Sequence, residues 1–220
     1  MRGPAGRLVD QQESSRNRVC HGRASKMDCI IFCGDPFATK PAAFDDPRPR
    51  KHQQPGADEI TAALPRIDYH KLMLQNQTVK FALPGMRIDL GGIAKGHAVD
   101  RAIEIARQCG IPHAVISAGG DSRILGDKQG RPRIFGIQHP RRTDELVLRL
   151  PLSNTAISTS GDYERFFIAD DERIHHILNP QTGKSAKSSW STTVIGADAT
   201  TTDALSTMVF ILGPQKGLHL

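Results

Sequence analysis

The segment Asp-Leu-Gly-Gly-Ile-Ala-Lys-Gly at residues 89–96 constrains the fold of this chain more than any other stretch. A carboxylate ends an apolar run, two glycines, a lysine and a third glycine follow, and an amphipathic pattern then begins. Glycine allows positive φ and close approach of the backbone to a ligand, and the free N–H groups of a helix N-terminus attract anions. The segment therefore predicts a tight strand-to-helix turn, with or without a bound phosphate.

Neither standard phosphate motif matches this segment. Walker A requires Ser or Thr after its Gly-Lys pair, whereas Lys95 is followed by Gly96 and His97. The G-x-G-x-x-G pattern of dinucleotide-binding folds is also absent. Any anion bound here must therefore be held by a different arrangement.

Charge is distributed unevenly along the 220 residues, which carry a formal net charge of +6. Residues 1–56 hold ten of the 29 Lys and Arg but six of the 23 Asp and Glu, so the remainder is nearly neutral. A nucleic-acid-binding surface would need a basic face interleaved with aromatic residues, and aromatics make up only 5% of the chain. We therefore expect no nucleic-acid partner.

Two segments differ in their patterning. Residues 1–56 lack sustained periodicity and include five prolines between Pro36 and Pro55, which predicts a largely disordered segment. The apolar piece 29–32 is the single candidate strand there, and residues 57–220 form the predicted domain. No apolar run is long enough to span a membrane, and the N-terminus lacks the apolar region of a signal peptide, so the sequence predicts no export route.

Periodicity within residues 57–220 predicts an α+β fold, with mixed or antiparallel sheets and a few packed helices. Ala94, Ala98 and Ala102 recur at helical spacing, and Cys109 closes the same face, which predicts that Cys109 lies in the core. The expected elements are a helical turn at 59–64, strands at 71–74 and 78–83, a helix at 94–109 before Gly110, strands at 113–118, 133–138, 145–150, 155–159, 163–169, 173–178 and 191–197, and a final helix capped by Thr201 or Thr202 and stopped by Gly213-Pro214.

Asp203 and Thr207 lie one turn apart on the final helix and therefore share a face. A carboxylate and a hydroxyl are hard oxygen ligands that suit Mg²⁺. The alternative is structural, since an Asp in a first turn complements the helix dipole and a Thr hydroxyl can bond a carbonyl of the preceding turn.

Polar residues also follow two predicted strands, at Gly119-Gly120-Asp121 and Ser158-Thr159-Ser160-Gly161. Both segments could hold a nucleotide or could be plain turns. His175 and His176 should face opposite sides of their strand, and one of them could act as a general base. Hydrolase chemistry has little support, because no Ser-His-Asp order or nucleophile elbow occurs.

Five motifs occur in the order seen in the ApbE family, the FAD:protein FMN transferases, which this chain resembles from about Ala63 to Leu218. They are Asp-Leu-Gly-Gly-Ile-Ala-Lys-Gly-His-Ala-Val-Asp (89–100), Ile-Ser-Ala-Gly-Gly-Asp (116–121), Ile-Ser-Thr-Ser-Gly-Asp-Tyr (157–163), His-Ile-Leu-Asn-Pro-Gln-Thr-Gly (176–183) and Asp-Ala-Leu-Ser-Thr (203–207). The resemblance implies Mg²⁺-dependent transfer of FMN from FAD to a threonine or serine hydroxyl of a target flavoprotein, with release of AMP.

The resemblance also implies roles for individual residues. Asp203, Thr207 and the backbone carbonyl of Ala94 match the family's Mg²⁺ ligands, and His176 matches a histidine suited to deprotonate the acceptor hydroxyl. Asp203 and His176 are therefore the expected catalytic residues. The flavin nucleotide should contact the two loops and the glycine motif, through Gly91, Gly92, Lys95, Gly119, Gly120, Asp121, Ser158, Thr159, Ser160 and Gly161.

Family members usually act in the periplasm or at the inner membrane, and they carry a longer N-terminal region. We therefore expect a chain truncated at both ends relative to the family, lacking part of the nucleotide pocket. A flavin or nucleotide binder without catalysis and an inactive fragment are the alternative functions, and Mg²⁺-dependent release of AMP from FAD separates them from the transferase.

Overall fold

The computed structural model describes residues 54–220. The predicted strand at 29–32 and nearly all of the predicted disordered segment 1–56 lie outside the described residues. The fold is α+β, as the sequence predicts, and every strand pairing in the described part is antiparallel. The helical elements are α1 (Ala57–Ala63), α2 (Ala94–Gln108) and α3 (Ala199–Gly217), with short 3₁₀ turns η1 (Leu64–Arg66) and η2 (Tyr69–Lys71).

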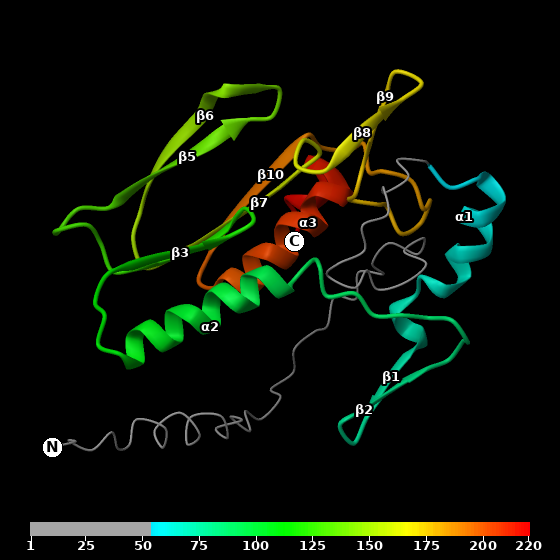
Figure 1. Cartoon of the computed structure of the whole chain (residues 1–220), viewed down its shortest axis with the longest axis horizontal. Coiled ribbons are helices and arrows are strands. Elements are labelled where there is room, and N and C mark those ends of the chain that lie inside the picture. Colours follow the sequence, from blue (N-terminus) through cyan, green and yellow to red (C-terminus); the bar gives the residue numbers. More distant parts are fainter. Residues whose placement is uncertain (1–53) are drawn as a thin grey trace, which may run out of the picture.

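A four-stranded sheet in the order β10-β7-β4-β3 forms the centre of the molecule. Its strands are β3 (Ala114–Ala118), β4 (Asp121–Leu125), β7 (Ala156–Gly161) and β10 (Ser191–Gly196). Helices α2 and α3 lie side by side against one side of this sheet (Figure 1). Three more antiparallel hairpins surround this layered core, namely β1–β2 (Leu72–Gln75, Thr78–Phe81), β5–β6 (Arg133–His139, Arg142–Leu152) and β8–β9 (Phe166–Ala169, Glu172–His175).

Strand β4 was missed by the sequence analysis, which read Gly119-Gly120-Asp121 as a loop. Asp121 instead pairs with Ala118 as the first residue of β4, so Gly119 and Gly120 are the whole connection between two strands. Their φ angles of 53° and 97° fit the two-residue turns with positive φ that join antiparallel strands tightly. The two glycines are therefore required by the hairpin itself.

Helix α2 occupies the predicted span, but the face that it buries differs from the predicted one. The buried side chains are Val99, Ile103 and Ala106, together with Gly96, and they pack on Ala156, Ala199 and Leu125. Cys109 is exposed, so the prediction that it lies in the core is wrong. The helix contacts both the sheet and α3. The side of α2 that carries Gly96 is buried because α3 packs against it.

Helix α3 begins earlier than predicted. The side chain of Asp198 caps it by accepting a hydrogen bond from Thr201 N at 2.7 Å, so neither Thr201 nor Thr202 is the cap. The regular helix breaks at Gly213, whose φ is 81°, as the Gly213-Pro214 signal predicts, and one further turn continues to Gly217. Phe210 is fully buried with Ile177 and Ala186 in a core cluster at this end.

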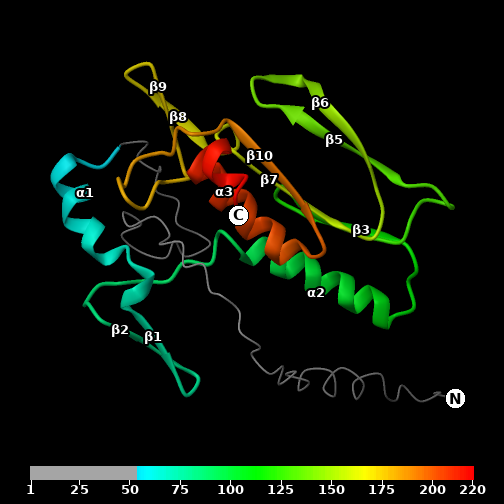
Figure 2. The ribbon, with the colours of Figure 1, turned by 180° about the vertical axis from the view of Figure 1, so that it is seen from behind.

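The peripheral hairpins occur where the sequence predicts them, but β8 and β9 are shorter than the predicted strands at 163–169 and 173–178. In the view from behind, β5–β6 lies on the side of the central sheet away from the two helices, and β8–β9 extends from the end near α3 (Figure 2). Asn76-Gln77 and Asp170-Asp171 form the turns of β1–β2 and β8–β9, all four at positive φ. Across residues 54–220, no helix has both the length and the apolar character needed to cross a bilayer.

Candidate active site

A lysine joins two buried carboxylates where α2 and α3 meet the central sheet. Lys95 Nζ lies 2.9 Å from Asp121 Oδ2 and 3.0 Å from Asp203 Oδ1. Both aspartates are only 2% exposed, whereas the lysine side chain is 39% exposed. The glycine motif, the first position of β4 and the final helix, far apart in sequence, therefore contribute one charged residue each to a single cluster.

Asp203 is fixed by the close approach of the two helices. Its second oxygen, Oδ2, accepts a hydrogen bond from Gly96 N at 2.9 Å. A Cβ on Gly96 would lie 2.1 Å from the carbonyl oxygen of Ala199 and 2.8 Å from Asp203 Cβ, distances that no side chain tolerates. The third glycine of the motif is therefore a packing requirement, and it lets the backbone amide near the start of α2 reach the carboxylate.

Asp100 holds the N-terminus of α3 against α2. Its carboxylate accepts hydrogen bonds from Ala199 N at 2.9 Å, Thr200 N at 2.8 Å and Thr200 Oγ1 at 2.6 Å. Arg123 Nη1 of β4 contacts the same carboxylate at 2.6 Å. The sequence analysis gave this residue no role, although it ends the first of the five motifs.

The pKa values of the Asp121 and Asp100 carboxylates are shifted in opposite directions. Burial raises the pKa of Asp121, Lys95 opposes the effect, and the charge of Asp203 adds to it. Burial would also raise the pKa of Asp100, but its hydrogen bonds from Thr200 and Ala199 and its contact with Arg123 lower it overall. Burial alone would lower the pKa of Lys95, and its contacts with Asp121 and Asp203 raise it overall. Lys95 is therefore firmly cationic.

The hydroxyls of β7 alternate between the two sides of the sheet, as a strand requires. Ser158 is fully buried and pairs with Thr202 Oγ1 at 2.8 Å. Ser160 Oγ contacts Ser206 Oγ at 2.8 Å and Thr207 Oγ1 at 3.0 Å. These two serines thus bind β7 to α3, close to the carboxylate cluster.

The other two members of that predicted set point elsewhere. Thr159 Oγ1 contacts Thr193 Oγ1 of β10 at 2.9 Å. A Cβ on Gly161 would lie 2.4 Å from the ring of Tyr163, so the glycine gives the tyrosine room. The structure does not bring Thr159 to the α3 side of the sheet.

The two glycine pairs lie on either side of Lys95. Gly91 N donates to Asp89 Oδ1 at 2.6 Å in the turn that leads through Gly92 into α2. A Cβ on Gly119 would lie 3.0 Å from Lys95 Cδ, so the lysine stem passes close over the β3–β4 turn, which continues through Gly120. Of these four glycines, Gly119 is the one that the structure places against Lys95.

The donor set at the cluster suits a hard divalent cation. Asp203 and Thr207 share one face of α3, where Thr207 Oγ1 lies 3.4 Å from the backbone oxygen of Asp203. Asp121 Oδ2 is buried, and it meets Lys95 without the alignment of a hydrogen bond. Within residues 54–220, no three His, Cys, Asp or Glu side chains gather to bind a metal, but Mg²⁺ commonly takes only one or two carboxylates. The residues therefore fit Mg²⁺, with Ala94 at the first position of α2 to supply a carbonyl.

His175 and His176 separate as predicted. His175 is buried, and its Nε2 lies 2.8 Å from the carbonyl oxygen of Ala186, which makes it a core residue. His176 is exposed and its Nδ1 lies 3.3 Å from the carbonyl oxygen of Arg165. Desolvation by the surrounding chain lowers the pKa of His176, and the charges of Arg165 and Lys95 contribute to this lowering.

Arg141, at the tip of β5–β6, was not anticipated by the sequence analysis. Its guanidinium forms a bidentate pair with Asp162 at 2.7 and 2.6 Å, and it stacks over Trp190 at 4.4 Å from the ring centroid. Asp162 follows β7 directly and is 6% exposed. The hairpin tip is thereby fastened to the segment that carries the β7 hydroxyls.

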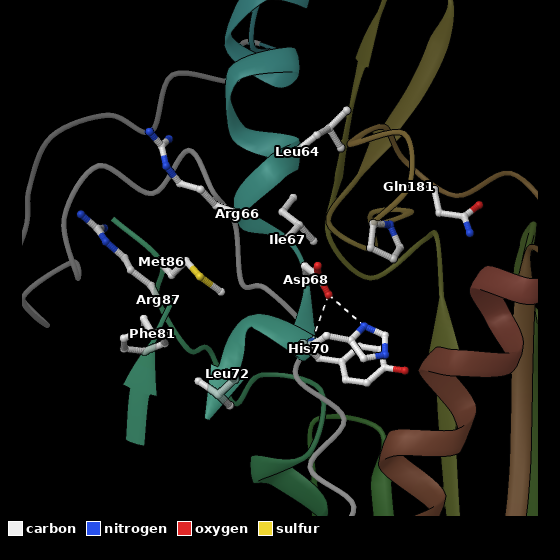
Figure 3. A pocket seen from close by; sticks show the side chains of 12 residues that line it. Leu64, Arg66, Ile67, Asp68, His70, Leu72, Phe81, Met86, Arg87 and Gln181 are labelled. Atoms are coloured by element: carbon white, nitrogen blue, oxygen red, sulfur yellow. Dashed lines mark hydrogen bonds and ion pairs between the residues drawn. The ribbon is translucent and has the colours of Figure 1, made fainter. Parts of the chain in front are cut away.

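A separate cavity of about 580 Å³ lies between the 3₁₀ turns η1 and η2, the β1–β2 hairpin and the turn at 180–181 (Figure 3). Apolar side chains such as Leu64, Met86 and Phe81 share its wall with polar ones such as Asp68, a mixture typical of small-molecule sites. Asp121, Lys95 and Asp203 are not among its lining residues. Pro180 and Gln181, which follow His176 closely in sequence, line the cavity. The charged cluster lies outside it.

Comparison with known proteins gives a consistent result. The model of a family described as the ApbE family matches residues 39–220. A protein of Klebsiella pneumoniae named FAD:protein FMN transferase is 35% identical over 170 residues, covering 76% of this chain and 52% of that protein. A protein of the same name from Treponema pallidum is 33% identical over 184 residues, covering 76% and 51%. The chain thus spans about half the length of the relatives it matches.

Solved structures agree with these relatives. The ApbE protein of Thermotoga maritima superposes with a TM-score of 0.69 at 43% identity, covering 73% of this chain and 52% of that one. A flavinyl transferase of Pseudomonas stutzeri superposes with a TM-score of 0.66 at 30% identity, covering 79% and 54%.

Proposed function

The chain belongs to the ApbE family, and from this membership we propose that it transfers FMN from FAD to a threonine or serine hydroxyl of a target flavoprotein. The reaction depends on Mg²⁺ and releases AMP. The oxygen of the acceptor hydroxyl forms a bond to the phosphorus on the FMN side of the FAD pyrophosphate. The bond from that phosphorus to the bridging oxygen of the pyrophosphate breaks, and AMP leaves with that oxygen. Relatives named FAD:protein FMN transferase support the transfer of FMN from FAD to a protein.

The cluster of Lys95, Asp121 and Asp203 is the observation that supports this function most strongly. Two carboxylates that are almost fully buried are costly unless they are paired or hold a cation. The amide of Gly96, near the start of α2, donates to the Asp203 carboxylate, and the backbone dipoles at a helix N-terminus favour an anionic group. A site that gathers buried oxygens, a lysine and a helix start is suited to a pyrophosphate with its cation.

Asp203, Thr207 and the carbonyl of Ala94 would hold Mg²⁺, which when bound neutralises charge on the pyrophosphate. Gly96 N keeps the Asp203 carboxylate oriented through its hydrogen bond. Ser160 keeps the Thr207 hydroxyl in place at 3.0 Å. These contacts fix the oxygens in advance, so little reorganisation is needed when substrate arrives.

His176 is the proposed general base. Its lowered pKa leaves the imidazole neutral and able to accept a proton at neutral pH. The proton comes from the acceptor hydroxyl as its oxygen attacks phosphorus. Because His176 is exposed, a protein substrate can bring its hydroxyl to the imidazole from outside.

The test is incubation of the full chain with FAD, Mg²⁺ and an acceptor flavoprotein domain, followed by intact mass measurement of the acceptor. We expect the acceptor to gain the mass of one FMN residue, AMP to appear in equal amount, and EDTA to abolish both. The matched control is the same domain with its acceptor threonine changed to valine, which should gain nothing.

Two results would contradict the proposal in different ways. FAD that binds without any AMP or acceptor product would indicate a flavin binder without catalysis. A chain that neither binds FAD nor releases AMP would show that these 220 residues do not constitute a working transferase.

A further inference from the structure

Lys95 is the single cation between two buried carboxyl groups. Asp121 and Asp203 are each 2% exposed, and the one ammonium group of Lys95 contacts both of them. A divalent cation would bring twice the charge of that ammonium to the same two side chains. Buried charges interact strongly because little water screens them, so the identity of the cation between Asp121 and Asp203 matters to the whole site.

The lysine is held in a way that allows it to leave. Its side chain is 39% exposed, and it reaches the carboxylates across the β3–β4 turn, with its Cδ 3.0 Å from where a Cβ of Gly119 would be. Its bond to Asp203 Oδ1 is 3.0 Å long, while its contact with Asp121 lacks hydrogen-bond alignment. Lysine is a flexible chain ending in a point charge with no fixed geometry, so a short rotation frees it.

We infer that Lys95 is a displaceable resident cation, which neutralises Asp121 and Asp203 while no divalent cation is bound and competes with that cation for their oxygens. Once displaced, its charge becomes available at the open side of the cluster to an anionic substrate group. This inference rests on the proposed function, because it takes the cation site at Asp203 as its premise. Lys95 contacts the two carboxylates before the divalent cation binds, and it contacts the anionic substrate group afterwards. Asp121 lies beside the bound cation.

The first experiment measures binding of Mn²⁺ alone to the full chain by isothermal titration calorimetry, without FAD. We expect Lys95→Met, which keeps an unbranched side chain one atom shorter and removes its charge, to bind Mn²⁺ about tenfold more tightly, because a competitor is gone. The control is Lys187→Met, which breaks the exposed pair with Glu172 and should change the affinity by less than about twofold.

The outcomes separate the inference from its premise. Wild-type binding of Mn²⁺ with unchanged or weaker binding by Lys95→Met would overturn the displaceable-cation role and leave the proposed metal site intact. Failure of both proteins to bind Mn²⁺ would overturn both. Tighter binding by Lys95→Met alone supports the inference.

A second measurement needs no variant, so it stands even if Lys95→Met does not fold. The full chain is treated with acetic anhydride, and the acetylation rates of Lys95 and Lys187 are read by peptide mass spectrometry. We expect Mn²⁺ to raise the rate at Lys95 several-fold, because the displaced amine leaves its carboxylates, and to leave Lys187 unchanged. A rate at Lys95 that stays constant or falls would contradict displacement.

Discussion

At the scale of single residues, the site depends on contacts that fix a charge rather than on the residue types alone. Asp203 is held by Gly96 N at 2.9 Å and by Lys95 at 3.0 Å. His176 is held by a weak contact to the Arg165 carbonyl and is influenced by nearby positive charge. The position of each side chain is therefore set by neighbours that are remote in sequence.

The lowered pKa of His176 leads to a prediction about pH. As the required base, the imidazole is active when neutral, so the transfer rate should fall only as the pH drops through its pKa, which lies below the ordinary value of 6.5. The acid limb of a single-turnover pH–rate profile should therefore lie below 6.5. His176→Gln should slow transfer by about a hundredfold or more and remove the limb, while FAD affinity measured by fluorescence changes little. Equal losses in transfer and in FAD affinity would contradict the base role.

At the scale of elements, the site depends on how α3 is placed against α2 and β7. Asp198 caps α3 from within its own segment, whereas Asp100 caps it from α2 and also binds Arg123 of β4. At the other end of β7, Arg141 fastens the β5–β6 hairpin to Asp162. These side chains position the elements that carry the chemistry.

The two caps of α3 should differ in their effect on stability. Asp100→Ala leaves buried donors on Ala199, Thr200 and Arg123 without their acceptor, so we expect the free energy of unfolding to fall by about 3 kcal/mol. Asp198→Ala removes one exposed cap, and we expect a loss of about 1 kcal/mol. Urea unfolding followed by circular dichroism measures both, and equal losses would contradict the bridging role of Asp100.

This stabilisation should also depend on pH. The pKa of Asp100 is lower in the folded protein than in the unfolded chain, so its contribution is present above the unfolded value and is lost as the pH falls through the folded value. The stability gap between wild type and Asp100→Ala should therefore shrink in acid. A gap that stays constant down to low pH would show that ionisation of Asp100 is not involved.

Two neighbouring arginines allow a controlled test of the hairpin clamp. Arg141→Met removes the bidentate pair with Asp162, whereas Arg142→Met removes only an exposed contact with Glu145. Amide hydrogen exchange should rise at the β5–β6 tip and around Asp162 in the first variant, because the two segments are released from each other. The second variant should match wild type, and similar exchange in both would contradict a clamp at Arg141.

At the scale of the whole molecule, periodicity predicted the elements well where the pattern is local. Helix α2 and the β8–β9 hairpin lie close to their predicted spans, because helical spacing and turn residues are properties of neighbouring positions. The buried face of α2 was predicted incorrectly because burial depends on α3, about a hundred residues away in sequence, which the pattern cannot show. Strand β4 was missed because its buried Asp121 does not read as part of a strand.

The candidate site likewise combines residues that the sequence motifs identify with contacts that only the tertiary fold shows. The five motifs identified the residues that meet at the cluster, but the pairing of Lys95 with both aspartates needs the tertiary fold. Asp100 and Arg141 were assigned no role, because each acts on an element remote in sequence. The hydroxyls of Ser158 and Ser160 hold β7 to α3, and their contact with a flavin nucleotide stays a prediction.

If the cluster around Asp203 carries out FMN transfer, Asp203→Asn should abolish most of the activity. This variant keeps an oxygen to accept the hydrogen bond from Gly96 N and removes the charge, so the fold should survive. The measurement is the rate at which an acceptor flavoprotein gains one FMN in the presence of FAD and Mg²⁺, by intact mass, with circular dichroism as the control for folding. The account predicts a folded protein with at least a hundredfold slower transfer, about 2.7 kcal/mol in the barrier. A folded Asp203→Asn variant that transfers FMN at the wild-type rate would contradict it.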